Sequence, residues 1–169
     1  MDQAQLKAMQ APLKSRYRDD PQSAIITLEA EGRIGEESIT CKVSTGKAMV
    51  EAGLHPATGG DGLSACSGDM LLEALVACAG VTMKAVATAL GIELRDARVR
   101  AEGDLDFRGT LGVDKQAAVG FREIRLRFAL DTDADDAELE TLQRLTERYC
   151  VIYQTLRNPP RFEVSRSRA

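Results

Sequence analysis

The feature that most constrains this chain is an apolar stretch of helical length, residues 70–90. The stretch is long enough to span a membrane, but it contains Glu73 and Lys84 and directly follows Asp69. Charges at these positions favour a helix in the core of a soluble protein over one in lipid. Asp69 suits the start of a helix, and Gly91 suits its end. The sequence therefore predicts a long central helix, apolar nearly all round and packed on several sides.

Period-two patterns on either side of this helix predict β-strands. The expected strands are residues 25–31, residues 38–43 after a turn at 32–37, a segment from Arg98 that includes Leu105 and Phe107, residues 121–130, and a final edge strand with Phe162 and Val164. A second helix is expected to open with the acidic run 131–136, because acids suit a helix N-terminus. This order of elements indicates the α+β class.

Length and charge limit the possible functions. The chain has 169 residues, enough for one domain, which we place at 22–169 after a polar N-terminal arm, 1–21. The net charge is −4 with dispersed cations, and aromatic residues make up 4%, so nucleic-acid binding is not expected. The N-terminus lacks the apolar core of a signal peptide. We therefore expect a cytoplasmic protein without a membrane anchor.

The chain has four cysteines, and in a reducing cytosol they are expected to be free or catalytic rather than paired structurally. Cys78 lies inside the apolar stretch and Cys150 follows the second expected helix. Cys41 shares one strand face with apolar neighbours, which is typical of a core residue. Cys66 is either an alternative resolving thiol or, the reading we favour, a loop residue. No Cys-x-x-Cys spacing occurs and His55 is the only histidine, so no metal site is predicted.

The segments around Cys78 and Cys150 resemble those of the OsmC/Ohr family of thiol-dependent hydroperoxide reductases. Residues 71–78, Leu-Leu-Glu-Ala-Leu-Val-Ala-Cys, are similar to the pattern that carries the family's reactive cysteine on a long central helix. Cys150 with the Thr-Leu pair at 155–156 is similar to the family's second cysteine segment. The two segments and the order of elements cover most of the chain.

Three positions depart from the family pattern. Val151 stands where the family usually has proline, and Tyr153 stands where it often has serine. The acid that the peroxidases carry about ten residues before the cysteine falls on Gly68. These differences indicate a divergent branch.

The resemblance implies an OsmC-like fold with antiparallel sheets around the buried central helix, and an intertwined homodimer with active sites at the subunit interface. It also implies a cysteine-based peroxidase in which Cys78 attacks the hydroperoxide and Cys150 resolves the oxidised sulfur. A nearby guanidinium would favour the thiolate. The candidate supporting residues are the arginines Arg16, Arg18 and Arg33 and the acids Asp69 and Glu73.

Apolar residues near Cys78, including Val81 and Met83, favour an organic hydroperoxide over hydrogen peroxide as substrate. No bound cofactor is expected; an external dithiol reductant would regenerate the thiols, and a lipoylated protein, thioredoxin and glutathione all remain open. The alternative functions are a non-catalytic protein of the same fold that binds a small molecule, and a structural, stress-associated dimer.

Overall fold

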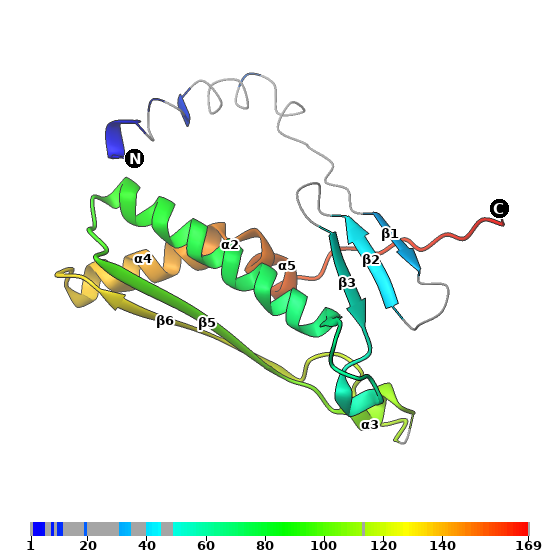
Figure 1. Cartoon of the computed structure of the whole chain (residues 1–169). Helices are drawn as coiled ribbons and strands as arrows, with labels where there is room; N and C mark the ends of the chain where they lie inside the picture. Colours follow the sequence, from blue (N-terminus) through cyan, green and yellow to red (C-terminus); the bar gives the residue numbers. More distant parts are fainter. Residues whose placement is uncertain are drawn as a thin grey trace.

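The structure is a computed structural model that describes residues 2–5, 8, 10–11, 19, 31–34, 40–44, 49–112 and 114–168, with only the backbone pairing described for 31–34 and 40–44 (Figure 1). The ordered elements of this part are β1 (Glu31–Ile34), β2 (Thr40–Ser44), β3 (Met49–Gly53), η2 (Pro56–Thr58), β4 (Ala65–Cys66), α2 (Ser67–Leu90), β5 (Asp96–Asp104), α3 (Phe107–Thr110), β6 (Glu123–Asp131), α4 (Asp136–Tyr149) and α5 (Val151–Arg157). The class is α+β, as predicted.

Helix α2 is the predicted central helix. It begins one residue after Cys66 and ends at Gly91, whose φ of 75° gives the left-handed conformation typical of a helix C-terminus. Four fully buried residues spaced four apart form its inner stripe: Leu75, Ala79, Met83 and Ala87. Helix α2 is long and apolar enough to cross a membrane, but this stripe packs against α4, α5 and the β5–β6 ribbon, which places α2 in the centre of the fold.

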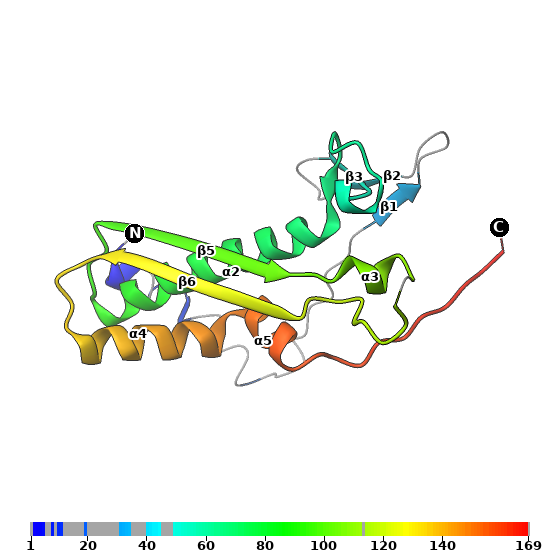
Figure 2. The ribbon, with the colours of Figure 1, turned by 90° about the horizontal axis from the view of Figure 1, so that it is seen from below.

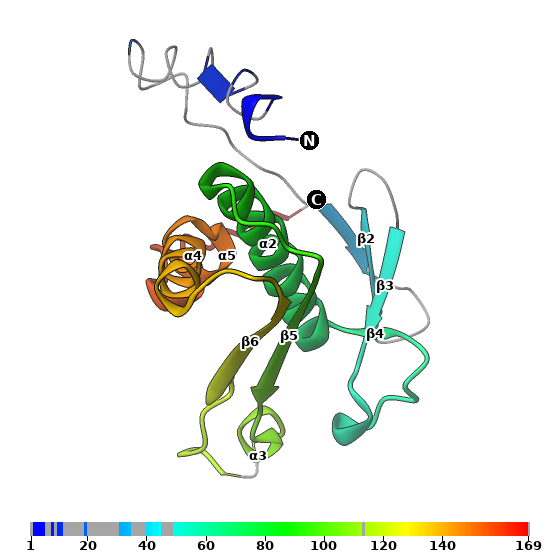
Figure 3. The ribbon, with the colours of Figure 1, turned by 90° about the vertical axis from the view of Figure 1, so that its left-hand side faces the viewer.

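One face of α2 is only partly covered by the described residues, although the helix was expected to pack on several sides. Near its C-terminal end, Gln3 Nε2 donates to the Ala89 carbonyl at 2.8 Å. Val81 is 74% exposed although it lies in the middle of the helix. Figure 3, which looks along the molecule from one end, shows α4 and α5 on one side of α2 and the β5–β6 ribbon below it. The structured neighbours of α2 therefore pack on its inner stripe and leave apolar residues uncovered elsewhere.

Strands β5 and β6 form a long antiparallel ribbon in which Val99 pairs with Phe128 and Ala101 with Leu126. These side chains pack against the buried residues of α2, and Figure 2 shows the ribbon running along the helix. The residues between them, among them Arg100, Glu102 and Arg127, form a row of ion pairs. This confirms the strand expected at 121–130, although β6 extends to Asp131, which we expected to open the second helix. The strand expected from Arg98 is also found, but it ends before Phe107, which instead begins α3.

The other strands form a separate four-stranded sheet in the order β1-β2-β3-β4. The first two pairings are antiparallel, and β3 pairs parallel with β4. The sheet adjoins the N-terminal end of α2 and projects from it (Figures 1 and 2). Residues 32–34 are part of β1 and not of a turn, because they pair with residues 41–43 of β2. The rest of the expected strand 25–31, apart from Glu31, lies outside the described residues.

The C-terminal part begins with a capping box at the start of α4: Asp135 accepts from the Glu138 N–H, and the Glu138 carboxylate accepts from the Asp135 N–H, both at 2.9 Å. After α5 the expected final strand is absent, and residues 158–168 have no strand pairing. Phe162 is 79% exposed there. Two prolines precede it, and proline lacks the N–H that a strand ladder requires.

Candidate functional site

Cys78 and Cys150, which are 72 positions apart in the sequence, lie together where α2 contacts α5. Cys78 projects from the middle of α2, and Cys150 occupies the break between α4 and α5. Cys150 is only 1% exposed and forms a buried cluster with Leu75 and Ala79, against which the partly buried Cys78 packs. Both thiols are free. The structure thus brings the two predicted residues into direct contact, next to the core.

The break at Cys150 arises from its extended backbone, with φ −74° and ψ 108°. The Cys150 N–H still donates to the Thr146 carbonyl of α4 at 2.9 Å, while its carbonyl accepts from the Gln154 N–H of α5 at 2.9 Å. Cys150 therefore ends one helix and begins the next, and Val151 is the first residue of α5. A proline at this position of a helix has no N–H, whereas Val151 keeps one.

The Cys78 sulfur accepts several hydrogen bonds. Burial acts to raise the pKa of the Cys78 thiol, but the backbone N–H groups of Ile152 and Val151 oppose this by donating to the sulfur. The Cys150 thiol and the Thr82 hydroxyl donate as well. Together these hydrogen bonds outweigh burial and hold the pKa of Cys78 below its ordinary value. Hydrogen bonds to the charged form stabilise a thiolate, which is the nucleophilic form of cysteine.

The pKa of Cys150 is shifted in the opposite direction to that of Cys78. Burial is the largest influence and raises the pKa of the Cys150 thiol. Cys78 raises that pKa further, because the Cys150 proton is shared with the neighbouring sulfur and because a Cys78 thiolate repels a second negative charge. The N–H groups of Tyr153 and Ile152 act against this without reversing it. The pair therefore consists of one thiol that ionises readily and one that stays protonated.

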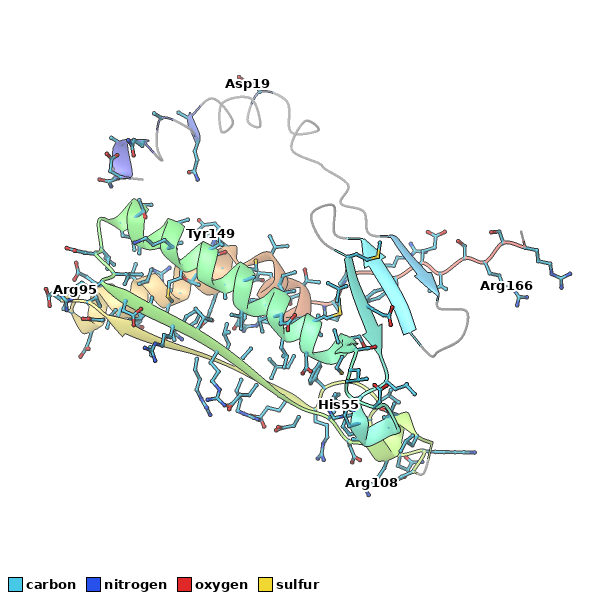
Figure 4. All side chains as sticks on the ribbon, in the orientation of Figure 1. Asp19, His55, Arg95, Arg108, Tyr149 and Arg166 are labelled. Carbon is cyan, nitrogen blue, oxygen red and sulfur yellow. The ribbon has the colours of Figure 1, made fainter. Side chains whose placement is uncertain are left out.

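Two grooves lie near this pair, and Tyr149 lines both of them. The first, about 480 Å³, follows the exposed face of α2 and is lined on its other side by Gln10 of the N-terminal arm and by Tyr149. Its α2 wall consists of Val81, Thr82, Ala85, Val86 and Ala89. The second, about 510 Å³, includes Cys150 and Val151. Figure 4 labels the exposed Tyr149 beside α2. A small molecule in the first groove would meet Thr82, which is one helical turn from Cys78 and bonded to its sulfur.

The acids predicted to support Cys78 do not lie beside it. Asp69 is nine residues before Cys78, about two and a half turns, and therefore points from the opposite side of the helix. Glu73 shares a separate shallow pocket with Asp69 and Ala101. Gly68, at the family's acid position, faces the apolar side chains of Phe121 and Leu105. The described part of the chain thus places no acid in the expected role.

The candidate arginines cannot be assigned from the described residues. Arg33 belongs to β1, but only its backbone pairing is described. Arg16 and Arg18 lie outside the described residues. Their role therefore remains a prediction.

A third cavity, of about 440 Å³, opens between β6 and the two C-terminal helices. Its apolar part includes Leu75, Phe128 and Leu156, and its polar part includes Glu147 and Tyr153. This cavity was not predicted from the sequence, because its lining joins α2 to the consecutive elements β6, α4 and α5, and their packing on one another has no local sequence signal. The only relevant signal was Tyr153, noted as a departure from the family pattern.

The remaining candidates have structural positions. The Nδ1 atom of His55 accepts from the Ala57 N–H at 3.0 Å, and the ring stacks on Phe107 with 4.9 Å between ring centroids (Figure 4). His55 thus caps the short helix η2. Cys66 immediately precedes α2 and is not in a loop but at the end of β4. It is twelve residues from Cys78, about 18 Å along the helix axis, which is too far for a disulfide. Among the described residues, no group of three His, Cys, Asp or Glu side chains could hold a metal.

Comparison with known proteins gives the family. The family model described as OsmC-like protein matches residues 59–165, which contain both Cys78 and Cys150. The chain belongs to the OsmC family. No curated protein sequence matches it, which is consistent with a divergent branch of that family.

Solved structures of the OsmC family share the fold at low sequence identity. An OsmC-like protein from Mycoplasma pneumoniae is 18% identical, with a TM-score of 0.65 over 79% of this chain and 89% of that one. An organic hydroperoxide resistance protein from Elizabethkingia anophelis is 15% identical, with a TM-score of 0.64 over 80% and 91%. A protein of the same description, OsmC from Legionella pneumophila, is 18% identical, with a TM-score of 0.62 over 79% and 91%.

Proposed function

We propose that this OsmC-family protein is a cysteine-based peroxidase that reduces hydroperoxides through Cys78 and Cys150. The observation that carries the proposal is the hydrogen-bonded contact between the two thiols, with the pKa of Cys78 lowered and that of Cys150 raised. This division suits a nucleophile and a resolving thiol. Two structural neighbours described as organic hydroperoxide resistance proteins give independent support.

The proposed reaction has three balanced steps. The Cys78 thiolate attacks one oxygen of ROOH and the O–O bond breaks; the sulfur becomes a sulfenic acid and ROH leaves after taking up a proton. The Cys150 thiol then condenses with the sulfenic acid, forming the disulfide and releasing water. A dithiol reductant finally returns both cysteines to thiols by exchange and is itself oxidised to a disulfide. The contact between the sulfurs means that the second step needs little rearrangement.

The groove along α2 supports an organic hydroperoxide as substrate. Its wall of Val81, Ala85, Val86 and Ala89 is apolar, so it would bind an alkyl or aryl group while the peroxide lies near Cys78. Hydrogen peroxide has no such group and gains nothing from this wall. A lipoylated protein or thioredoxin would serve as the external dithiol; glutathione, a monothiol, would do so with two molecules, which leave joined by a disulfide. No bound cofactor is required.

A cytoplasmic homodimer is the proposed form of the protein. Val81 on α2 and Val151 on α5 are 74% and 66% exposed, although both adjoin the cysteine pair. Large apolar residues grouped in this way are typical of a surface that a second subunit covers. A partner subunit would also bring further side chains to the grooves, including a guanidinium of the kind expected from Arg16, Arg18 or Arg33.

The alternative is a non-catalytic protein that binds a small apolar molecule. The cavity of about 440 Å³ beside Leu75 and Phe128 favours it, because small-molecule sites have this size and character. The absence of an acid at Gly68 also fits a chain that has lost turnover. The two functions predict different behaviour of the thiols toward peroxide.

Hydroperoxide consumption with dihydrolipoamide as reductant tests the proposal. Cumene hydroperoxide should be consumed catalytically and faster than hydrogen peroxide, and Cys78→Ser should abolish the reaction. Cys66→Ser serves as a matched control and should retain it. Equal rates for the two peroxides would remove the substrate preference, and an inactive wild-type protein would favour the binding function.

A further inference from the structure

Several side-chain hydrogen bonds converge on Glu147, three residues before Cys150. Its Oε1 accepts from Gln143 Nε2 at 2.9 Å, and its Oε2 accepts from the Tyr153 hydroxyl at 3.1 Å. Its backbone carbonyl accepts from Gln154 Nε2 at 2.8 Å. One residue near the end of α4 is therefore bonded to two consecutive residues of α5. We call Glu147, Tyr153 and Gln154 the helix clamp.

The helix clamp spans the break at Cys150. The backbone there is extended, so the direction of α5 does not follow from that of α4. Helix α5 has only seven residues, too few to be stable without tertiary contacts. On its apolar side, Ile152, Tyr153 and Leu156 pack against the cluster that contains Cys150. The side-chain hydrogen bonds that join α5 to α4 in the described part of the chain are those of the helix clamp.

The clamp is embedded among a small set of charged and titratable groups. Arg157 Nη1 donates to the Tyr153 hydroxyl at 3.3 Å, and no described carboxylate lies within ion-pair distance of Arg157. The titratable or charged groups at the junction come from every element packed there. Helix α4 contributes Glu147, Arg148 and Tyr149, the break contributes Cys150, α5 contributes Tyr153 and Arg157, and α2 contributes Cys78. Arg122 and Glu123, at the start of β6, line the same cavity as Glu147, Tyr153 and Arg157. The ribbon also contributes apolar side chains to the cysteine cluster, among them Val99 and Leu126.

We propose that Glu147 is a positioning residue for the cysteine pair: through Tyr153 and Gln154 it holds Cys150 and the turn that follows it against Cys78. Glu147 is not among the groups that bond to either sulfur. The inference rests on the proposed redox role of the pair and extends it. Without the bond between the Glu147 carboxylate and the Tyr153 hydroxyl, only the bond from Gln154 to the Glu147 backbone carbonyl remains. Helix α5 can then shift from α2, so Cys78 loses donors and Cys150 no longer stays within reach of its sulfur.

The test is the pH dependence of Cys78 alkylation by iodoacetamide in the reduced protein, with the modified cysteine identified by peptide mass spectrometry. Glu147→Ala and Tyr153→Phe should both move the titration of Cys78 upward and slow its alkylation at pH 7, on the order of tenfold for Glu147→Ala, since the thiolate is the reactive form. Glu147→Gln keeps an oxygen acceptor for Tyr153, so its rate of Cys78 alkylation at pH 7 should lie between those of wild type and Glu147→Ala.

Glu140→Ala is the matched control. Glu140 lies two turns earlier on α4, is exposed, and makes no hydrogen bond or ion pair with the described residues, so its variant should follow the wild-type profile. Tyr153→Phe removes a single hydroxyl and retains the packing of the ring, so a folded variant is expected even if Glu147→Ala is destabilised. Wild-type alkylation profiles in Tyr153→Phe and in folded Glu147→Ala would overturn the proposal.

The same experiment separates this inference from the proposed function, because alkylation requires no peroxide. If wild-type protein does not react with cumene hydroperoxide, the peroxidase proposal fails. If Glu147→Ala and Tyr153→Phe still move the titration of Cys78 upward in that case, Glu147 positions the thiols of a protein with another function.

Discussion

Cys78 and Cys150 share a hydrogen bond across the contact between α2 and α5, and their pKa values move in opposite directions. Cys150 donates to the Cys78 sulfur, so its proton stabilises the thiolate of its neighbour. In return, the negative charge on Cys78 makes ionisation of Cys150 unfavourable. The nucleophile and the protonated partner are thus determined by one contact.

The Val151 N–H is one of the donors that lower the pKa of Cys78. Val151→Pro removes this N–H at the first position of a helix, where proline is otherwise well tolerated. Alkylation of Cys78 at pH 7 should slow on the order of tenfold, since a hydrogen bond to a charged group contributes about 1.5–3 kcal/mol. Val151→Ala keeps the N–H and should resemble wild type. Equal rates for the proline and alanine variants would show that this N–H does not stabilise the thiolate.

The Thr82 hydroxyl is a second donor to the same sulfur. Thr82→Val preserves the shape of the side chain but removes the donor, so Cys78 should require a higher pH to ionise. We expect its alkylation at pH 7 to fall several-fold, and the consumption of cumene hydroperoxide to fall with it. Thr88→Val, which removes a hydroxyl bonded to the Lys84 carbonyl of the same helix, should leave both rates unchanged. A matching loss in Thr88→Val would point to a general effect on α2.

The lowered pKa of Cys78 links its ionisation to folding. At pH values between the lowered pKa of Cys78 in the folded protein and its pKa of about 8.5 in the unfolded chain, the unfolded state binds more protons than the folded state. The contribution of Cys78 to stability therefore grows as pH rises through this range. It is lost as pH falls through the pKa of the folded state. The contribution of Cys150 to stability changes with pH in the opposite direction, because the pKa of Cys150 is raised in the folded state. We therefore compare Cys150→Ser, which keeps a donor, with the double variant Cys78→Ala/Cys150→Ser. Their difference in urea unfolding free energy should grow from pH 6.5 to pH 9; a constant difference would contradict the link.

The exposed face of α2 predicts a subunit interface. Val81→Asp should weaken the proposed dimer, since burying an unpaired carboxylate costs on the order of 2 kcal/mol or more. Sedimentation velocity should then show monomer at concentrations where wild type is dimeric. Val119→Asp, at a position 63% exposed in the loop before β6, is the control and should stay dimeric. A monomeric wild-type protein would contradict the prediction.

Much of the fold could be predicted from local patterns. Helix α2 was predicted from the length and apolarity of residues 70–90 and from the helix end at Gly91. Strands β2, β5 and β6 were predicted from the alternation of apolar and polar residues. Strand β3 was missed, and residues 32–34 were assigned to a turn although they pair in β1. Pairing partners decide strand boundaries in a small sheet, and they are not visible in the chain's own periodicity. The final strand around Phe162 was wrong for the same reason: alternation alone does not supply a strand to pair with.

The candidate site was predicted in part. The two cysteines could be selected because their segments resemble a family pattern, and the structure brings them together. Asp69 and Glu73 were chosen by nearness in sequence, but helix geometry directs them away from Cys78. The donors at Val151, Ile152 and Thr82 were not predicted. Backbone N–H groups have no sequence signature, and their direction depends on the break at Cys150.

The most direct test of the account is peptide mass spectrometry of the fully reduced protein after one equivalent of cumene hydroperoxide. The account predicts a disulfide between the peptides that contain Cys78 and Cys150, with Cys66 still reduced, and no such disulfide in Cys78→Ser. Folded protein in which Cys78 and Cys150 both remain thiols after this treatment would contradict it.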